Sequence, residues 1–119
     1  QQEERAENEI RYKEIKSKFF NIKISDGKIC IQVLQDINDF YEEGKALHHC
    51  VYTNSYYTKP ESLILSARIG NKRLETIEIS LTTMEIIQVR GACNQDSKYH
   101  EQIVELIKNN MNVIRKIAA

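Results

Sequence analysis

Two histidines and a cysteine stand side by side at His48, His49 and Cys50, in a chain with only three residues of each kind. A thiol can act as a nucleophile when a nearby imidazolium or a helix N-terminus favours the thiolate. Adjacent side chains diverge, so His48, His100 or a residue from elsewhere would partner Cys50 better than His49 does. Alternatively, Cys50 is a small buried residue and His49 a hydrogen-bonded structural one, because free cysteine is often buried.

A zinc ion held by His49, Cys50, Cys93 and His100 is a third alternative for the same stretch. These ligand types suit zinc, but the chain has neither Cys-x-x-Cys nor His-x-x-x-His spacing. We therefore expect no metal site and no cofactor.

A second candidate site follows the last predicted strand, within residues 88–95. Gly91 would let the backbone come close to a ligand, and Arg90 would lie beside N–H groups that open the next helix and could hold an anion. The Gly-x-x-x-x-Gly-Lys-Ser/Thr pattern of a phosphate loop is absent. The alternative is an ordinary strand-to-helix corner in which Asn94 or Asp96 caps the helix.

Composition limits the classes of protein that the chain can represent. Basic and acidic residues both number 17, and this balance weighs against strong non-specific binding of polyanions. No apolar run reaches the roughly 20 residues of a membrane span, so we expect no membrane insertion. An odd number of cysteines at irregular positions favours a reducing, cytoplasmic location. Because the chain begins with Gln1, we interpret residues 1–119 as a single domain excised from a longer protein.

Hydrophobic periodicity and turn residues predict an α+β domain. The expected elements are a helix over 1–18, a β-hairpin over 20–34, short helices from Asp36 that Gly44 interrupts or ends, strands over 62–69, 73–81 and 84–90, and a C-terminal helix that Asp96 or Ser97 caps and that runs to about 117. The last three strands form a three-stranded antiparallel meander. One face of the sheet is expected to lie under the helices.

The strand registers follow from keeping the apolar side chains on one face. In the hairpin, a two-residue turn at Asp26-Gly27 pairs Ile24 with Ile29. In the meander, only an odd-length loop around Thr83 keeps the faces separate. That loop gives the pairs Thr76–Arg90, Ile77–Val89, Glu78–Gln88 and Ile79–Ile87.

The second face of the meander combines charged residues, acceptors and planar donors on neighbouring strands. Its predicted members are Ser66, Arg68, Thr76, Glu78, Gln88 and Arg90. This polar face is either a solvated surface with cross-strand ion pairs or a functional surface. We expect the His49–Cys50 turn to lie over it or beside it, which would create one shared site.

Several motifs together resemble a known family. They are Glu43-Gly44 with Leu47, His49-Cys50-Val51 with Tyr56 or Tyr57, Ile64 and Arg68, Glu75-Thr76-Ile77-Glu78, and Gln88-Val89-Arg90-Gly91 with Asn94. This combination resembles the PcfJ-like family of bacterial conjugative plasmids and integrated mobile elements, and it covers roughly residue 36 to the end. The family's namesake is associated with conjugative DNA transfer.

The resemblance implies an accessory domain of a mobile-element protein, with nucleic acid or conjugative-transfer proteins as partners. The candidate catalytic residues are His49, Cys50 and Glu78, and the candidate binding residues are Arg68, Gln88, Arg90, Gly91 and Asn94. One alternative is an enzyme with a His49–Cys50 centre that acts on an anionic or nucleic-acid substrate. Another is a structural scaffold domain within a larger chain.

Overall fold

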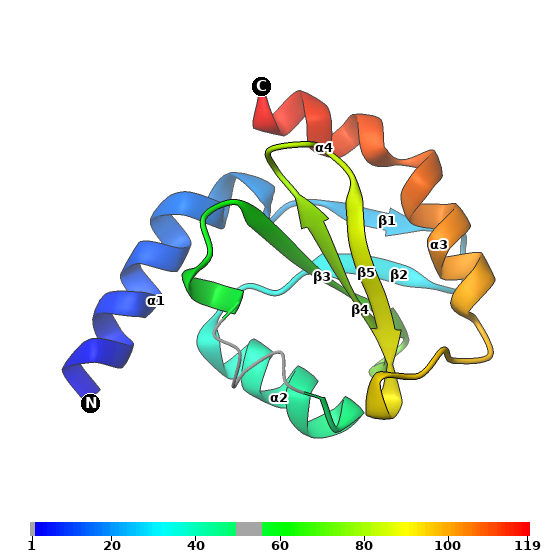
Figure 1. The fold of residues 1–119 in the computed structure, drawn as a ribbon, viewed down its shortest axis with the longest axis horizontal. Coiled ribbons are helices and arrows are strands. Elements are labelled where there is room, and N and C mark those ends of the chain that lie inside the picture. Colours follow the sequence, from blue (N-terminus) through cyan, green and yellow to red (C-terminus); the bar gives the residue numbers. More distant parts are fainter. Residues whose placement is uncertain (1, 50–55) are drawn as a thin grey trace.

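A computed structural model describes residues 2–49 and 56–119. In this part of the chain the strands form one five-stranded antiparallel sheet, in sequence order from β1 to β5 (Figure 1). The strands are β1 Lys23–Ser25, β2 Cys30–Val33, β3 Ser62–Ile69, β4 Lys72–Ser80 and β5 Ile86–Gly91. The α+β class is confirmed. The separate three-stranded meander is not, because β2 pairs with β3 and joins the hairpin to it.

Helices cover both faces of the sheet in the described part of the chain. They are α1 Gln2–Lys16, α2 Ile37–Leu47, α3 His100–Asn109 and α4 Met111–Ala118, with 3-10 turns η1 Ser17–Phe19, η2 Tyr56–Thr58 and η3 Ala92–Asn94. The polar face is therefore not open along its length, since α1 and α2 pack over it. None of the described helices combines the length and the apolar character needed to cross a membrane.

The main hydrophobic core lies between the sheet and the α3–α4 pair. Four residues of that pair at helical spacing are buried there, namely Ile103, Ile107, Met111 and Ile114. A smaller cluster on the other face holds Tyr12, Leu34, Phe40 and Ile64 together. The sheet thus has an apolar layer on one side and a mixed layer on the other.

The predicted C-terminal helix is wrong in two details. It begins at His100, and its N-cap residue is Tyr99 instead of Asp96 or Ser97. The Ser97 hydroxyl accepts from the Tyr99 N–H at 3.2 Å just before the helix. It also divides into α3 and α4 at Asn110, whose side-chain amide donates to the Leu106 carbonyl. Such a side-chain bond takes up a carbonyl at the end of α3.

The hairpin turn lies one residue later than predicted, at Gly27-Lys28. Ile24 pairs with Ile31 instead of Ile29, and Gly27 takes the positive φ of the turn, at 95°. The Asp26 carboxylate explains the position, because it accepts from the backbone N–H of Lys28 and of Ile29 and fixes the start of the turn. Since the pairing shifts by two residues, every side chain keeps its predicted face.

The meander register is confirmed for its first three pairs, including Thr76–Arg90 and Glu78–Gln88, but not for the fourth. Ile79 pairs with Ile86, and Ile87 is 53% exposed. The loop closes where the Ser80 N–H donates to the Glu85 carbonyl at 2.9 Å. Four residues lie inside that loop, so a bulge takes up the change of register.

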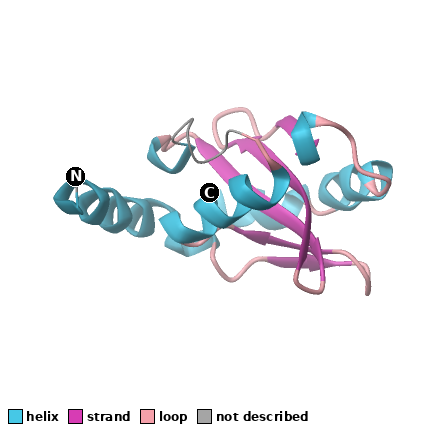
Figure 2. Ribbon diagram, turned by 90° about the horizontal axis from the view of Figure 1, so that it is seen from below, coloured by secondary structure: helices cyan, strands magenta, loops and turns pink. Residues whose placement is uncertain are grey.

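Helix α1 buries two side chains that end in polar groups and leaves two isoleucines partly or largely exposed. Tyr12 and Lys16 are 2% exposed, whereas Ile10 and Ile15 are 59% and 37% exposed. Both buried side chains donate to backbone carbonyls, which satisfies their polar ends. The N-terminal half of α1 projects beyond the sheet (Figures 1 and 2).

Helix α2 begins as predicted, with the Asp36 side chain accepting from the Asp39 N–H at 2.7 Å. It does not end at Gly44 but continues to Leu47. The residue after it, His48, has a left-handed φ of 52° and donates its N–H to the Gly44 carbonyl. This left-handed residue turns the chain sharply at the end of the helix.

Gly91 should tolerate no side chain. A Cβ there would lie 2.6 Å from the Gln95 carbonyl oxygen and 3.2 Å from the Leu74 carbonyl oxygen, both of them backbone atoms. We expect Gly91→Ala to lower the free energy of unfolding by about 1–3 kcal/mol, because the tight corner must open. Urea denaturation would measure this loss. Ala92→Ser, at the exposed neighbouring position, is the control and should have little effect.

Candidate functional site

The centre of the site is Glu43, which points from α2 onto the polar face. Glu43 falls between Phe40 and Leu47 on the buried side of the helix, and it is fully buried. The helical periodicity predicts an apolar residue at this position. A buried acid there requires hydrogen-bond donors nearby, because it loses its contact with water. Sequence reasoning named Glu43 only as part of a motif, although its place in this stripe was a usable signal.

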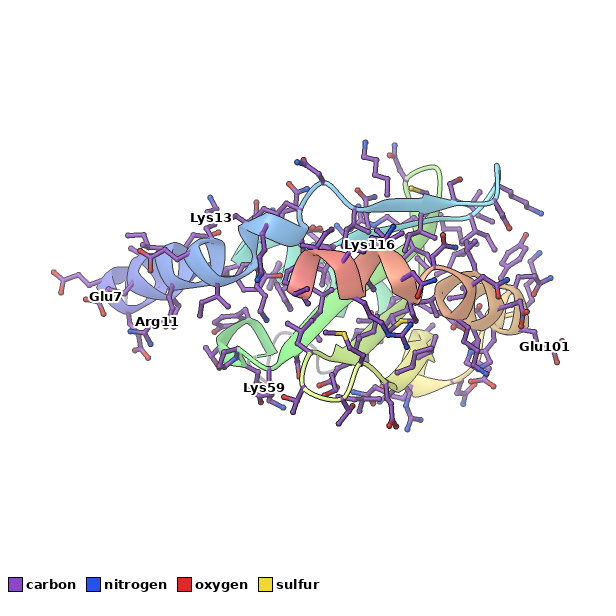
Figure 3. The ribbon with its side chains drawn as sticks, turned by 90° about the horizontal axis from the view of Figure 1, so that it is seen from above. Glu7, Arg11, Lys13, Lys59, Glu101 and Lys116 are labelled. Atoms are coloured by element: carbon purple, nitrogen blue, oxygen red, sulfur yellow. The ribbon has the colours of Figure 1, made fainter. Side chains whose placement is uncertain are left out.

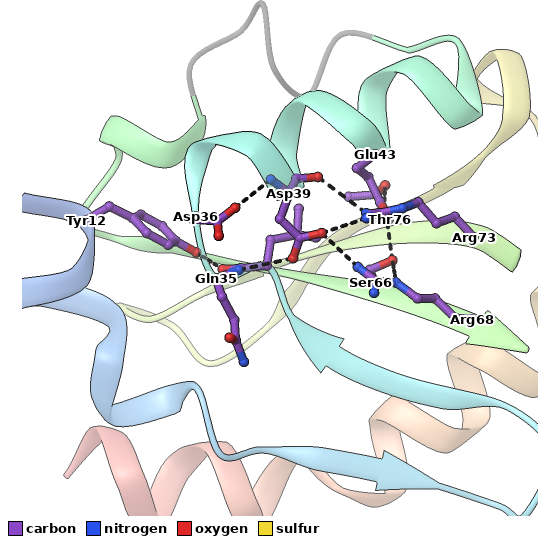
Figure 4. Close-up of polar contacts among 10 residues, drawn as sticks. Tyr12, Gln35, Asp36, Asp39, Glu43, Ser66, Arg68, Arg73 and Thr76 are labelled. Atoms are coloured by element: carbon purple, nitrogen blue, oxygen red, sulfur yellow. Dashed lines mark hydrogen bonds and ion pairs between the residues drawn. The ribbon is translucent and has the colours of Figure 1, made fainter. Parts of the chain in front are cut away.

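Three donors surround the Glu43 carboxylate (Figure 4). The Ser66 hydroxyl and the Arg73 guanidinium each donate to Oε1 at 2.7 Å, and the Thr76 hydroxyl donates to Oε2 at 2.5 Å. All three come from β3 and β4. These donors replace the water that the carboxylate loses on burial, and the bond from the guanidinium is charge-assisted.

Asp39 completes the charge balance beside Glu43. Its Oδ1 accepts from Arg73 at 2.6 Å and from Arg68 at 3.1 Å. Arg68 also donates from Nε to the Ser66 hydroxyl at 3.0 Å. Two arginines therefore face two acids, and we call Asp39, Glu43, Ser66, Arg68, Arg73 and Thr76 the Glu43 network. The structure places Arg68, a candidate for binding an external anion, in this internal ion pair.

His49 joins the network through Thr76. Its Nε2 lies 2.8 Å from Thr76 Oγ1. The single hydroxyl hydrogen of Thr76 goes to Glu43, so Nε2 must carry a proton and donate, which leaves the lone pair of a neutral ring on Nδ1. His49 thus lies on the polar face, as expected, while its neighbour His48 is exposed.

Burial is the main influence on the charge of His49. The loss of water lowers the pKa of its imidazole, and this effect outweighs the Glu43 charge and a backbone hydrogen bond, which both raise it. The ring is therefore neutral at pH 7. A neutral, oriented imidazole is the form in which histidine accepts a proton.

Glu78 forms a second buried acid on the same face. It is 6% exposed, and its two oxygens accept from the Ser62 hydroxyl at 2.7 Å and from the Gln88 amide at 2.9 Å. It lies two residues along β4 from Thr76, about 7 Å by strand geometry. The structure brings Glu78 and Gln88 together, in the register that the sequence predicted.

Arg90 is the exposed cation of the site. It lies opposite Thr76 on β5 and donates to the Asn94 carbonyl at 3.5 Å. The close approach expected at Gly91 is to the chain's own Gln95 carbonyl. Asn94 is exposed and has a left-handed φ of 61°.

The start of α3 does not offer an anion site, because the chain supplies its own anion there. The fully buried Glu75 accepts from the Ser97 N–H at 2.7 Å and contacts His100 Nδ1 at 2.9 Å. Glu75 and Thr76 are consecutive on β4 and point to opposite faces. His49 and His100 therefore lie on opposite sides of the sheet, and the zinc alternative that needs both is wrong. Cys50, the candidate nucleophile, lies outside the described residues.

The fold and the site define an α+β domain with a buried acid–base network between a helix and a five-stranded sheet. The chain belongs to the PcfJ-like family: the family model described as PcfJ-like protein matches residues 1–104. The match takes in the N-terminal helix and hairpin, which the motifs had not covered, and it ends within α3. No curated protein and no solved structure matches the chain.

Glu43→Gln should destabilise the domain strongly. The amide keeps the shape but removes the charge that faces Arg73 and puts a donor among three donors. We expect a loss of about 3 kcal/mol in the free energy of unfolding, measured by urea denaturation. Glu42→Gln, at the exposed neighbour on α2, is the matched control and should change stability by less than about 0.5 kcal/mol. Equal effects of the two changes would contradict the network.

The lowered pKa of His49 predicts a loss of stability in acid. Well above pH 6.5 the ring is neutral in both the folded and the unfolded state and has no effect on stability. Below that value the unfolded state takes up the proton first, so stability falls as the pH drops toward the folded pKa. NMR titration of the ring, with unfolding measured from pH 7.5 to 5, would check this.

His49→Gln should flatten this part of the stability profile. Thr76→Val should move the titration of His49, and Thr76→Ser, which keeps a hydroxyl, should restore it. An unshifted titration in the Val variant would show that Thr76 does not hold the ring.

Proposed function

We propose that this domain is an acid–base centre that acts on an anionic substrate, within a protein of a bacterial mobile element. The observation that carries the proposal is the chain of hydrogen bonds from the buried Glu43 through Thr76 to His49. It sets the tautomer of the imidazole and leaves Nδ1 as an acceptor. Buried acids that orient a histidine are a recurrent feature of catalytic sites.

His49 would act as the general base. Its Nδ1 would take the proton of a water molecule as the water oxygen attacks the electrophilic centre of the substrate. The bond from that centre to the leaving oxygen would break, and the departing alkoxide would take a proton from solvent. Arg90, exposed on the neighbouring strand, would attract the negative group of that substrate. We propose a phosphodiester as the substrate class, consistent with a role beside nucleic acid in conjugative transfer.

The arrangement of α2 gives less support to a purely binding role for the polar face. A stacking platform for nucleic acid needs an open surface with available cations. Here α2 lies over the middle of the face, and Arg68 is paired with Asp39. Arg90 and the residues around it are the part of the face that a partner could reach.

Hydrolysis of bis(p-nitrophenyl) phosphate by the purified chain is the direct test. We expect His49→Gln to lower the rate by about 10²–10⁴-fold, since general-base catalysis contributes roughly that much. The rate of the unchanged protein should fall in acid as His49 takes up a proton. His48→Gln is the control, because His48 is the exposed neighbour outside the network, and it should retain full activity. A rate that is the same in both variants would refute the proposal.

A further inference from the structure

Two lysines approach one tyrosine ring at the end of the domain where the β1–β2 turn meets the start of α3. The ammonium nitrogen of Lys28, in the turn, lies 4.8 Å from the centre of the Tyr99 ring, and that of Lys98 lies 5.2 Å from it. In Figure 3 the start of α3, marked by Glu101, lies at the same end of the domain as this turn. We call Lys28, Lys98 and Tyr99 the Tyr99 cluster.

The aromatic ring of the cluster is anchored, although it is not fully buried. Tyr99 is half-buried and packs against the main hydrophobic core, and its N–H donates to the Ser97 hydroxyl at 3.2 Å. Both lysines are exposed. The ring therefore gives two cations from different segments of the chain one fixed and uncharged neighbour.

No acid pairs with Lys28 in the described part of the chain, since none of the ion pairs there includes this lysine. Asp26 is the acid nearest to it in sequence, and the Asp26 carboxylate accepts from the backbone N–H of Ile29 and of Lys28. These backbone bonds lower the pKa of Asp26 more than the charge of Lys28 does. The carboxylate is thus directed at the turn and not at the ammonium group.

Lys98 likewise takes part in none of the ion pairs of residues 2–49 and 56–119. Asp96, two residues earlier, lies 3.5 Å from His100 Nδ1. Glu101, in the first turn of α3, points away from the hairpin in Figure 3. The acids on this side of the cluster therefore do not neutralise it.

The Tyr99 hydroxyl responds to the field of both lysines. A hydrogen bond from Lys28 lowers its pKa, and the charges of Lys28 and Lys98 and a bond from Lys98 lower it further, against the opposing effect of lost water. An environment that favours a phenolate also favours another anion placed there. An ammonium has three N–H groups, so a lysine that donates one to Tyr99 can donate others to a ligand.

We propose that the Tyr99 cluster binds a phosphate group in its dianionic form, either free phosphate or a phosphate monoester. Lys28 and Lys98 would each donate to a phosphate oxygen, and the Tyr99 hydroxyl would donate to a third. Two ammonium charges match the charge of such a group, which is about −1.5 to −2 at pH 7. The cluster lies on the α3 side of the sheet, away from His49, and does not rest on the proposed phosphodiester activity.

The proposal predicts a distinct dependence on pH. A phosphate monoester loses its second proton near about pH 6, so binding should strengthen from about pH 5 to 7. In alkaline solution Tyr99 loses the proton that it would donate, at a lower pH than an ordinary tyrosine, and binding should weaken. By linkage, bound phosphate should raise the pKa of Tyr99. His100 is the next residue, but its Nδ1 faces Glu75 and Asp96.

Methyl phosphate is the probe, with dimethyl phosphate as a comparison that carries only one negative charge. At constant ionic strength we expect methyl phosphate to shift the amide signals of Lys28 and Tyr99 in NMR spectra. It should also raise the pKa of Tyr99, measured by ultraviolet absorbance and assigned by its loss in Tyr99→Phe. Dimethyl phosphate should bind about fivefold more weakly, because it lacks one charge.

Lys28→Gln and Lys98→Gln should each weaken methyl phosphate binding about threefold to fivefold, the effect of losing one exposed ion pair. Tyr99→Phe keeps the ring and removes one donor, so it should weaken binding by a similar factor. Lys108→Gln is the matched control, since Lys108 is an exposed lysine in the last turn of α3, and it should bind as the unchanged protein does.

Three results would overturn the proposal. They are dimethyl phosphate binding as tightly as methyl phosphate, equal losses in Lys108→Gln and Lys28→Gln, and an unchanged pKa of Tyr99 at saturating methyl phosphate. Inorganic phosphate identifies the source of the group: tighter binding than methyl phosphate assigns the site to free phosphate, and weaker binding assigns it to an ester. His49→Gln should leave methyl phosphate binding unchanged, which separates this outcome from that of the proposed activity.

Discussion

The mixed layer of this domain depends on one buried carboxylate. A charged oxygen removed from water is costly unless donors replace the water that it has lost. Within the described residues the donors to Glu43 come from β3 and β4, so α2 lies over the sheet at a position where Ser66, Arg73 and Thr76 reach it. This requirement fixes the helix more narrowly than apolar packing alone would.

The same requirement divides the charged residues of the polar face into two groups. Arg68 and Arg73 form ion pairs inside the domain, because α2 places Asp39 and Glu43 beside them. Arg90 lies one strand further out and stays exposed. Residues that look equivalent by strand alternation therefore differ in role according to whether a helix covers them.

Strand alternation predicted the faces of the sheet well, because burial on one side allows only one phase of the pattern. The pairs Thr76–Arg90 and Glu78–Gln88 followed from it. Turn positions were less predictable, since the Asp26 carboxylate and the Ser80–Glu85 bond move them without changing the faces.

The candidate site was predictable only in part, because the sequence shows which residues share a strand face but not which helix crosses it. His49 was singled out by its type. The importance of Thr76 and Arg73 depends on the placement of α2, and periodicity does not encode that placement. The burial of Lys16 was not predicted for a similar reason. Its aliphatic stem packs like an apolar residue, but a lysine in the sequence is ordinarily expected to be exposed.

The consecutive residues Glu75 and Thr76 have a consequence for folding. Glu75 accepts a hydrogen bond from the Ser97 N–H near the start of α3, and Thr76 donates one to Glu43 on the opposite face of the same strand. If β4 slipped by a single position, the Glu75 carboxylate would turn toward Glu43 and two negative charges would meet in a dry interior. Misaligned sheets are thus penalised by repulsion as well as by lost packing. The buried acids therefore make the native strand alignment more stable than its one-residue neighbours, whatever the function of the folded domain.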